Sequence, residues 1–153
     1  TSRWAIGALA VALLALGFGL ETADRAEGYQ QSLPARQAAI RYVRENTSPE
    51  DTVLVWRDTR VNYFAQRESP TRYLVMRPLM DADPAGQARA LEFMDELLAA
   101  KPTLMIDTKM EGWGFLDFPG ENAQIEEKVR LLMSYYEPEE MISDWVVYRL
   151  GQK

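Results

Sequence analysis

The chain has no cysteine and no histidine among its 153 residues. These two residue types supply most zinc ligands, the thiolate nucleophiles and the base of serine-histidine hydrolases. Their absence excludes those chemistries, and a stand-alone hydrolase would need a lysine or carboxylate base instead. Absent cysteine does not fix the compartment, because an oxidising compartment permits disulfides without requiring them.

Clustered charge is also lacking along the sequence. The formal net charge is −6 at pH 7, and the lysines and arginines are scattered. Nucleic acids and anionic cytoplasmic leaflets bind gathered cations, so we expect no nucleic-acid partner. The acidic residues show no calcium-loop spacing, which favours a solvated acidic surface over a metal site. We therefore expect no metal and no cofactor in this fragment.

One long apolar run is present, over residues 4–20, which carry no charged side chain. At ~1.5 Å per residue, a helix of this length covers most of the ~30 Å hydrocarbon core of a bilayer. We predict a transmembrane helix over residues 1–22 and a stalk over residues 23–31. Two alternatives stay open: a secretory signal segment, and a buried core helix, which would normally show a polar face.

The chain begins with Thr1-Ser2 and not with methionine. We expect a fragment in which residues 1–22 are the last span of a larger membrane protein. One arginine precedes the apolar run, and the residues directly after it have a negative balance. The positive-inside rule counts mainly lysine and arginine, and on this basis we expect the following domain on the extracytoplasmic side of the membrane.

Residues 32–153 are enough for one compact domain, in which buried-type strands alternate with amphipathic helices. Continuous apolar runs predict strands over residues 53–56, 72–76 and 103–107. Helices are expected over residues 34–46, 60–66 and 84–100, and from residue 122 onward.

Local signals define several of these boundaries. Asp83 is a suitable N-cap with Pro84 at the first helical position, and Asn122 begins the last helix. Ser143-Asp144 has the composition of a hairpin turn. The predicted fold class is α/β: an N-terminal transmembrane helix, then a small three-layer α/β/α domain with a mostly parallel sheet and a C-terminal hairpin.

A set of characteristic residues begins at the end of the first predicted strand. They are Trp56, Asp58, the pair Tyr63-Phe64, Arg67, Pro70 and the pair Arg72-Tyr73. Together with the strand at Pro102 to Asp107 and the closing strand at Trp145 to Arg149, this pattern resembles the soluble C-terminal domain of bacterial GT-C class membrane glycosyltransferases. These are relatives of the protein mannosyltransferases and aminoarabinose transferases. The likeness covers roughly residues 31–149 and the preceding span.

The resemblance implies a function for the parent protein. Such enzymes use polyprenyl-phosphate sugars, and their catalytic aspartate lies in an early extracytoplasmic loop that is not in this sequence. We therefore expect no catalytic residue here, an inactive fragment, and an accessory extracytoplasmic domain. The implied partners are membrane lipid, the transmembrane portion of the parent, and a lipid-linked sugar or glycan acceptor. The alternative is a membrane-anchored α/β interaction or binding module with no enzymatic role.

Candidate binding residues lie after the predicted strands, because ligands of open α/β sheets collect at the carboxyl ends of the strands. They are Arg57, Asp58, Tyr63 and Arg67 after the first strand, with Arg60 and Asn62 around the same crevice, and Asp107 at the end of the strand over residues 103–107. Paired carboxylate and guanidinium groups can hold a saccharide hydroxyl or a lipid phosphate. The structural alternative is that Asp58 caps the next helix while Arg67 and Arg72 make ion pairs.

Residues 108–121 form a long segment without periodicity, and such loops tend to be functional. Trp113, Phe115 and Phe118 are predicted to contact the membrane or the transmembrane body, since aromatic rings are favoured at the interface. In the alternative, these rings fold back and cover the end of the sheet.

Overall fold

The computed structural model describes residues 33–109 and 114–151. No helix within these ranges is long and apolar enough to cross a membrane. The predicted span over residues 1–22 and the stalk over residues 23–31 lie outside them. The fold below is that of the compact unit that begins at Gln37.

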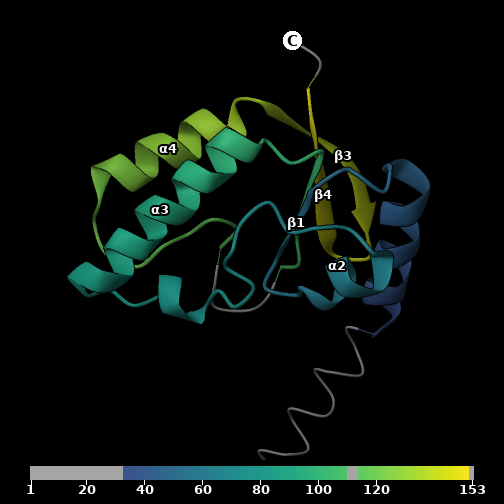
Figure 1. Ribbon diagram of the computed structural model, residues 1–153, viewed down its shortest axis with the longest axis horizontal. Coiled ribbons are helices and arrows are strands. Elements are labelled where there is room, and N and C mark those ends of the chain that lie inside the picture. Colours follow the sequence, from purple (N-terminus) through teal and green to yellow (C-terminus); the bar gives the residue numbers. More distant parts are fainter. Residues whose placement is uncertain (1–32, 110–113, 152–153) are drawn as a thin grey trace, which may run out of the picture. The chain divides into compact units, whose positions relative to one another are not determined.

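This unit is an α/β domain with one four-stranded mixed sheet (Figure 1). Its strands are β1 (Val53–Trp56), β2 (Leu104–Asp107), β3 (Tyr136–Ile142) and β4 (Trp145–Leu150). Its helices are α2 (Arg60–Ala65), α3 (Pro84–Ala100), α4 (Ala123–Met133) and the short 3-10 helix η1 (Arg77–Leu79). Residues 33–46 are also helical.

The strand order is β1-β2-β4-β3. Only β1 and β2 run parallel, whereas β4 is antiparallel to both of its neighbours. The sheet is therefore mixed, and the prediction of a mostly parallel sheet is wrong. After β3, the chain turns back at the predicted hairpin, and β4 then inserts between β3 and β2. The C-terminal hairpin itself is present as expected.

The strand predicted over residues 72–76 does not form. Arg72 and Tyr73, at the start of this segment, form hydrogen bonds with α3 and not with a neighbouring strand. The amide nitrogen of Arg72 donates to Glu96 Oε2 at 3.1 Å, and the Tyr73 hydroxyl donates to Glu92 Oε2 at 2.6 Å. These contacts hold the segment over the helix, away from the edge of the sheet.

The capping signals act as predicted at both long helices. The side chain of Asp83 accepts a hydrogen bond from the amide of Gly86 at 2.6 Å, directly before Pro84. Asn122 Oδ1 accepts from the amide of Gln124 at 3.1 Å at the start of α4. Each cap satisfies amides that the first helical turn leaves without partners.

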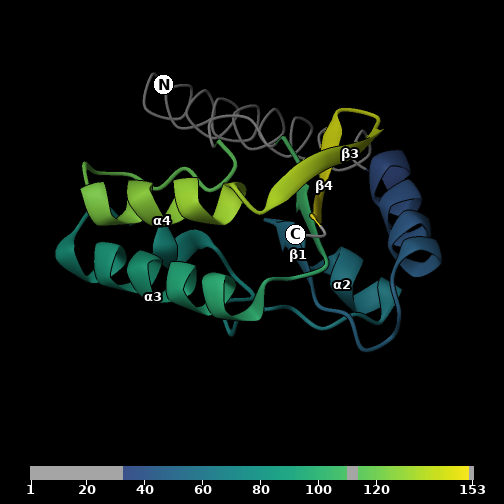
Figure 2. The same cartoon turned by 90° about the horizontal axis from the view of Figure 1, so that it is seen from above.

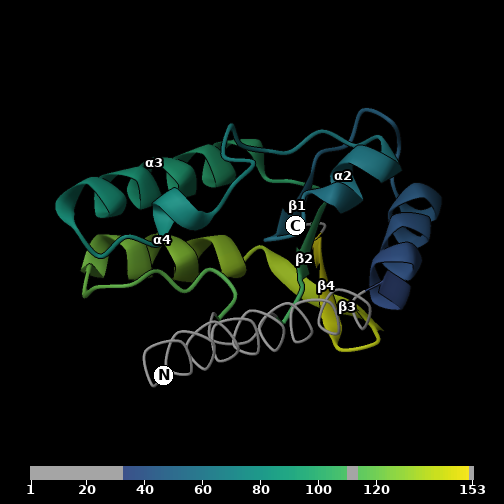
Figure 3. The same cartoon turned by 90° about the horizontal axis from the view of Figure 1, so that it is seen from below.

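Helices cover both faces of the sheet (Figures 2 and 3). On one side, α3 and α4 lie next to each other, and on the other side lie α2 and the helical residues 37–46. Leu54 and Trp56 of β1 point toward α3 and α4, because alternate strand residues face the same side.

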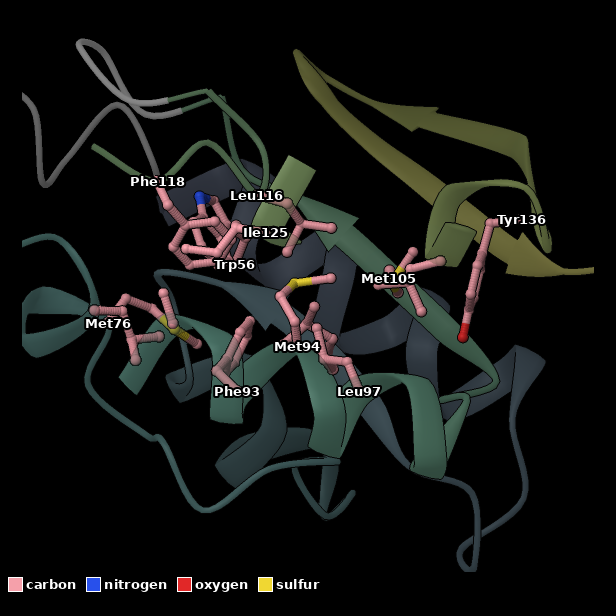
Figure 4. Packing of buried hydrophobic residues seen from close by; sticks show 14 residues of the cluster. Trp56, Met76, Phe93, Met94, Leu97, Met105, Leu116, Phe118, Ile125 and Tyr136 are labelled. Atoms are coloured by element: carbon pink, nitrogen blue, oxygen red, sulfur yellow. The ribbon is translucent and has the colours of Figure 1, made fainter. Parts of the chain in front are cut away.

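A hydrophobic cluster fills the space between β1, β2, α3 and α4 (Figure 4). Trp56 is fully buried at its centre, and its ring lies 6.0 Å from that of Phe93. Leu116 and Phe118, from the loop before α4, belong to the same cluster. The cluster therefore fixes the carboxyl end of β1, where the groove described next begins.

Candidate binding groove

A groove of about 660 Å³ lies at the carboxyl end of β1, between residues 57–60 and residues 74–81. The first wall is the connection from β1 to α2, and the second wall is the segment that leads through η1. Its lining residues are Arg57, Asp58, Thr59, Arg60, Leu74, Val75, Met76, Arg77, Met80 and Asp81.

Arg57 forms the corner between β1 and α2. Its backbone has a φ of 70°, in the left-handed region, so the chain turns sharply directly after Trp56. Partial burial lowers the pKa of the Arg57 guanidinium, because desolvation disfavours the charged form. The groove thus contains a cation that has lost part of its hydration.

Asp58 and Arg60 form a bidentate ion pair on the same wall. Arg60 Nε lies 2.7 Å from Asp58 Oδ1, and Arg60 Nη2 lies 3.1 Å from Asp58 Oδ2. The carboxylate is buried, whereas the guanidinium is half exposed. No side chain caps α2, whose N-cap residue is Thr59, so Asp58 orients Arg60 and does not act as the cap.

The opposite wall combines apolar and cationic side chains. Leu74 is 59% exposed and Val75 is 66% exposed. Arg77 is exposed and forms no ion pair with any carboxylate in the described part of the chain. Asp81 pairs instead with Arg89 at 3.1 Å.

Two of the predicted binding residues lie away from this groove. Tyr63 is 79% exposed, and its ring contacts that of Phe64 edge-on at 5.2 Å. Arg67 Nε donates to Thr47 Oγ1 at 2.8 Å, and its Nη2 donates to the Thr47 carbonyl at 2.8 Å. Arg67 therefore joins the end of α2 to the residue that follows the helical segment 33–46.

Asp107 is almost completely buried at the end of β2, opposite Trp56 in the parallel register. Its Oδ1 accepts from the amide of Lys109 at 3.0 Å, and its Oδ2 lies 2.7 Å from Lys109 Nζ. The hydrogen bond to Asp107 raises the pKa of the Lys109 ammonium. Asp107 thus shares the sheet edge with Arg57 and Asp58 but does not line the groove.

The predicted contact residues of the long loop have different positions. Phe118 is 9% exposed, and its ring meets that of Trp56 edge-on at 5.7 Å. Phe115 is half-buried and stacks on Tyr148 at 5.4 Å between ring centroids. Both rings thus cover the end of the sheet, as in the alternative interpretation, and a lipid contact by Phe118 would require the loop to leave the core. Trp113 lies outside the described residues.

Leu74, Val75 and Arg77 were not predicted as groove residues, because residues 72–76 have the composition of a strand. One local signal was available. The sequence Met-Arg-Pro at residues 76–78 places a proline two residues after the apolar run, and proline is rare in central strands.

No protein-family model matches the chain, and comparisons with curated proteins and with solved structures gave no significant match. Within residues 33–109 and 114–151, no group of three or more metal-ligating side chains is placed to hold an ion. The functional interpretation therefore depends on the groove and on the resemblance described above.

Proposed function

We propose that the chain is the accessory extracytoplasmic domain of a membrane glycosyltransferase that uses polyprenyl-phosphate sugars. The resemblance over residues 31–149 supports this proposal, and the α/β fold is compatible with it. In the proposal, the catalytic residues belong to the transmembrane part of the parent protein. The domain contributes by holding the donor or the acceptor above the membrane active site.

The observation that carries the proposal is the chemistry of the groove. The buried carboxylate of Asp58 orients the guanidinium of Arg60, and Arg57 and Arg77 line the same space. Guanidinium groups bind phosphate and saccharide oxygens through charge-assisted hydrogen bonds that are stronger than neutral ones. A volume of about 660 Å³ is in the range of small-molecule sites.

The experiment measures sugar transfer by membranes that carry the full-length protein, with a polyprenyl-phosphate sugar as donor. We expect Arg77→Ala to raise the KM for donor or acceptor several-fold with little change in kcat, because only a binding contact is lost. Arg41→Ala is the matched control, since Arg41 is an exposed arginine outside the groove. If Arg77→Ala and the wild type have equal kinetic constants, the groove does not bind the donor or the acceptor.

The second candidate is a membrane-anchored interaction module without enzymatic context. The exposed ring pair of Tyr63 and Phe64 favours it, because aromatic side chains are enriched at protein interfaces. The gene sequence upstream of residue 1 separates the two candidates. Many further apolar spans, with an acidic residue in the first outer loop, favour the transferase. A start codon directly before the single span would leave only the interaction module.

A further inference from the structure

Two aromatic rings on α2 are exposed and in contact with each other. Tyr63 is 79% exposed and Phe64 is 51% exposed, and their ring centroids lie 5.2 Å apart in an edge-on arrangement. Single apolar side chains are common on protein surfaces, whereas two rings in contact form one continuous apolar area. Free energy is gained when a second surface removes such an area from water.

Two arginines belong to the same surface. Arg44 Nη2 donates to the Phe64 carbonyl at 2.5 Å, which joins the helical residues 37–46 to α2. Arg41 lies three residues earlier, a spacing that makes the two arginines neighbours on the helix. Both are exposed, and neither forms an ion pair with a carboxylate of the described residues. We call Arg41, Arg44, Tyr63 and Phe64 the aromatic–arginine patch.

A second groove has the opposite charge. It has a volume of about 440 Å³ and lies between residues 115–122 and the first two turns of α4. Phe115 and Val129 are half-buried on its apolar wall, and Arg130 is the cation in its lining. Its carboxylates are those of Asp117, Glu121 and Glu126. We call this groove the acidic groove.

The three carboxylates of the acidic groove are available to a partner. Each of these residues is exposed. Within the part of the chain that the structure describes, none of the three carboxylates forms an ion pair. The groove thus combines an apolar wall with negative charges that are not compensated by a direct contact.

The patch and the acidic groove are complementary in polarity and in charge. The patch offers two rings and two guanidinium groups, and the groove offers an apolar wall and three carboxylates. Pairs of guanidinium and carboxylate groups form charge-assisted, often bidentate hydrogen bonds. Aromatic residues and arginine are also the residue types that carry most binding energy at protein interfaces.

The two surfaces lie too far apart to meet within one molecule. Figures 1 and 2 show α2 at one end of the domain, whereas α4 begins at the other end. Contacts between like surfaces of two copies are disfavoured, because a patch on a patch brings arginines together and a groove on a groove brings carboxylates together. Only contact between a patch and a groove joins opposite charges.

We propose that the aromatic–arginine patch of one copy docks into the acidic groove of a second copy of this chain. Tyr63 and Phe64 then cover the apolar wall, and Arg41 and Arg44 pair with the carboxylates. Because the two contact surfaces differ, the assembly is a head-to-tail chain or ring and not a two-fold dimer. The inference goes beyond the proposed function, since it requires neither a sugar nor an enzymatic parent.

The test measures the mass of the full chain, residues 1–153, by sedimentation equilibrium in neutral polyoxyethylene micelles at matched solvent density. We expect the average mass of the wild type to rise with concentration beyond that of a dimer, because each added copy exposes a new patch or groove. Tyr63→Ser removes a ring from the patch, and Glu121→Arg reverses a charge of the groove. Each variant alone should associate about tenfold more weakly than the wild type.

An equimolar mixture of the two variants is the decisive measurement. The Tyr63→Ser copy keeps an intact groove, and the Glu121→Arg copy keeps an intact patch. The mixture should therefore form a dimer with one copy of each variant, at the affinity of the wild type, and should grow no further. A mixture that associates as weakly as the separate variants would overturn the proposal.

Two control variants change exposed residues outside both surfaces. Leu131→Ser removes an apolar side chain that is 46% exposed on α4, and Glu137→Arg reverses a charge on β3. Both should associate within about twofold of the wild type, since surface substitutions away from a contact have small effects. Weakening by the controls equal to that by Tyr63→Ser and Glu121→Arg would also overturn the proposal.

Two further results would contradict docking between copies. Association that neither Tyr63→Ser nor Glu121→Arg weakens would come from another part of the chain, such as the apolar run over residues 4–20. A wild type that stays monomeric at every concentration would give the patch a different occupant. Nuclear Overhauser contacts between the Tyr63 ring and the alkyl chains of the detergent would then assign the patch to a membrane surface. These measurements involve no sugar transfer, so their outcome is independent of the transferase assay.

Discussion

The two faces of the sheet are stabilised in different ways, although the same four-residue strand, β1, contributes to both. Leu54 and Trp56 face α3 and α4 and lie in the large apolar cluster. Val53 and Val55 are equally buried but point to the other face, toward α2 and the helical residues 37–46. The first face is filled by the cluster around Trp56, whereas Leu104, Ile106 and Val147 lie beside the two valines on the second face.

Polar contacts add to apolar burial on the second face. Asn62 Nδ2 donates to the Val53 carbonyl at 2.7 Å, inside the protein. Tyr42 donates to Glu139 at 2.7 Å, which joins the helical segment to β3. Apolar burial is non-directional, whereas these bonds depend on geometry and charge. The two faces should therefore respond differently to truncation and to pH.

The largest expected effect is on the first face. Trp56→Ala should lower the free energy of unfolding by roughly 3 to 5 kcal/mol, because a fully buried ring is replaced by a cavity. Urea denaturation of the full chain in neutral detergent, followed by far-ultraviolet circular dichroism, measures it. Tyr63→Ala is the control and should stay within ~0.5 kcal/mol, since Tyr63 is exposed. If Trp56→Ala and Tyr63→Ala lowered the free energy of unfolding by similar amounts, the buried cluster would not be the main source of stability on the first face.

The loop before α4 sharpens the description of the first face. Phe118→Ala should cost about 3 kcal/mol, because its ring packs against both Trp56 and Phe93. Phe115→Ala should cost less, since that ring is half-buried. The same denaturation experiment ranks the two variants. An unchanged midpoint for Phe118→Ala would favour the membrane contact that the sequence analysis predicted.

A smaller effect is expected on the second face. Asn62→Ala should cost about 1 to 3 kcal/mol, because the buried Val53 carbonyl loses its side-chain donor. Asn46→Ala is a matched control, since the Asn46 amide donates to the Tyr42 carbonyl at 2.9 Å but is exposed to solvent. Its cost should be below ~0.5 kcal/mol. If the two asparagine variants lose equal stability, burial of the bond is not what matters on this face.

The smallest effect should depend on pH. The hydrogen bond from Arg149 is the main cause that lowers the pKa of Glu139 below its usual value of 4.5. The pKa of Glu139 is lower in the folded protein than in the unfolded protein. The stabilisation by its carboxylate is therefore complete above the unfolded pKa and is lost as pH falls through the folded pKa. Glu139→Gln should therefore be less stable than the wild type at neutral pH, by less than ~1 kcal/mol.

This difference should vanish in acid, and urea midpoints between about pH 7 and about pH 3 would follow it. Glu137→Gln, an exposed neighbour on β3, controls for the loss of one negative charge. A difference that is constant with pH, or that grows in acid, would show that the Glu139 carboxylate does not stabilise the second face.

Much of the local structure was predictable because it depends on neighbouring residues. The apolar run at residues 53–56 forms β1 with the predicted bounds, and Asp83 and Asn122 cap α3 and α4. The hairpin turn at Ser143-Asp144 is also where the sequence placed it. Strand burial, caps and turns are decided within a few residues, so a local pattern is sufficient.

Only part of the candidate site could be predicted from local sequence patterns. Arg57 and Asp58 were identified because they directly follow a buried strand, and both line the groove. Leu74, Val75 and Arg77 were not, because their position depends on a segment that returns to the end of β1. Tyr63 lies on the exposed side of α2, and Arg67 lies beyond the end of α2 and is bonded to Thr47, so neither lines the groove.

By itself, the sequence determined the alternation of strands and helices, because hydrophobic periodicity and caps are properties of short segments. The tertiary structure decided which strands pair and which apolar segments stay out of the sheet. Residues 72–76 have the composition of a strand, yet Glu92 and Glu96 hold them on α3. β4 lies beside β2 in an antiparallel register, and Phe118 packs into the core. In each case the deciding contacts join residues far apart in the sequence, and their free energies are realised only when the chain is packed.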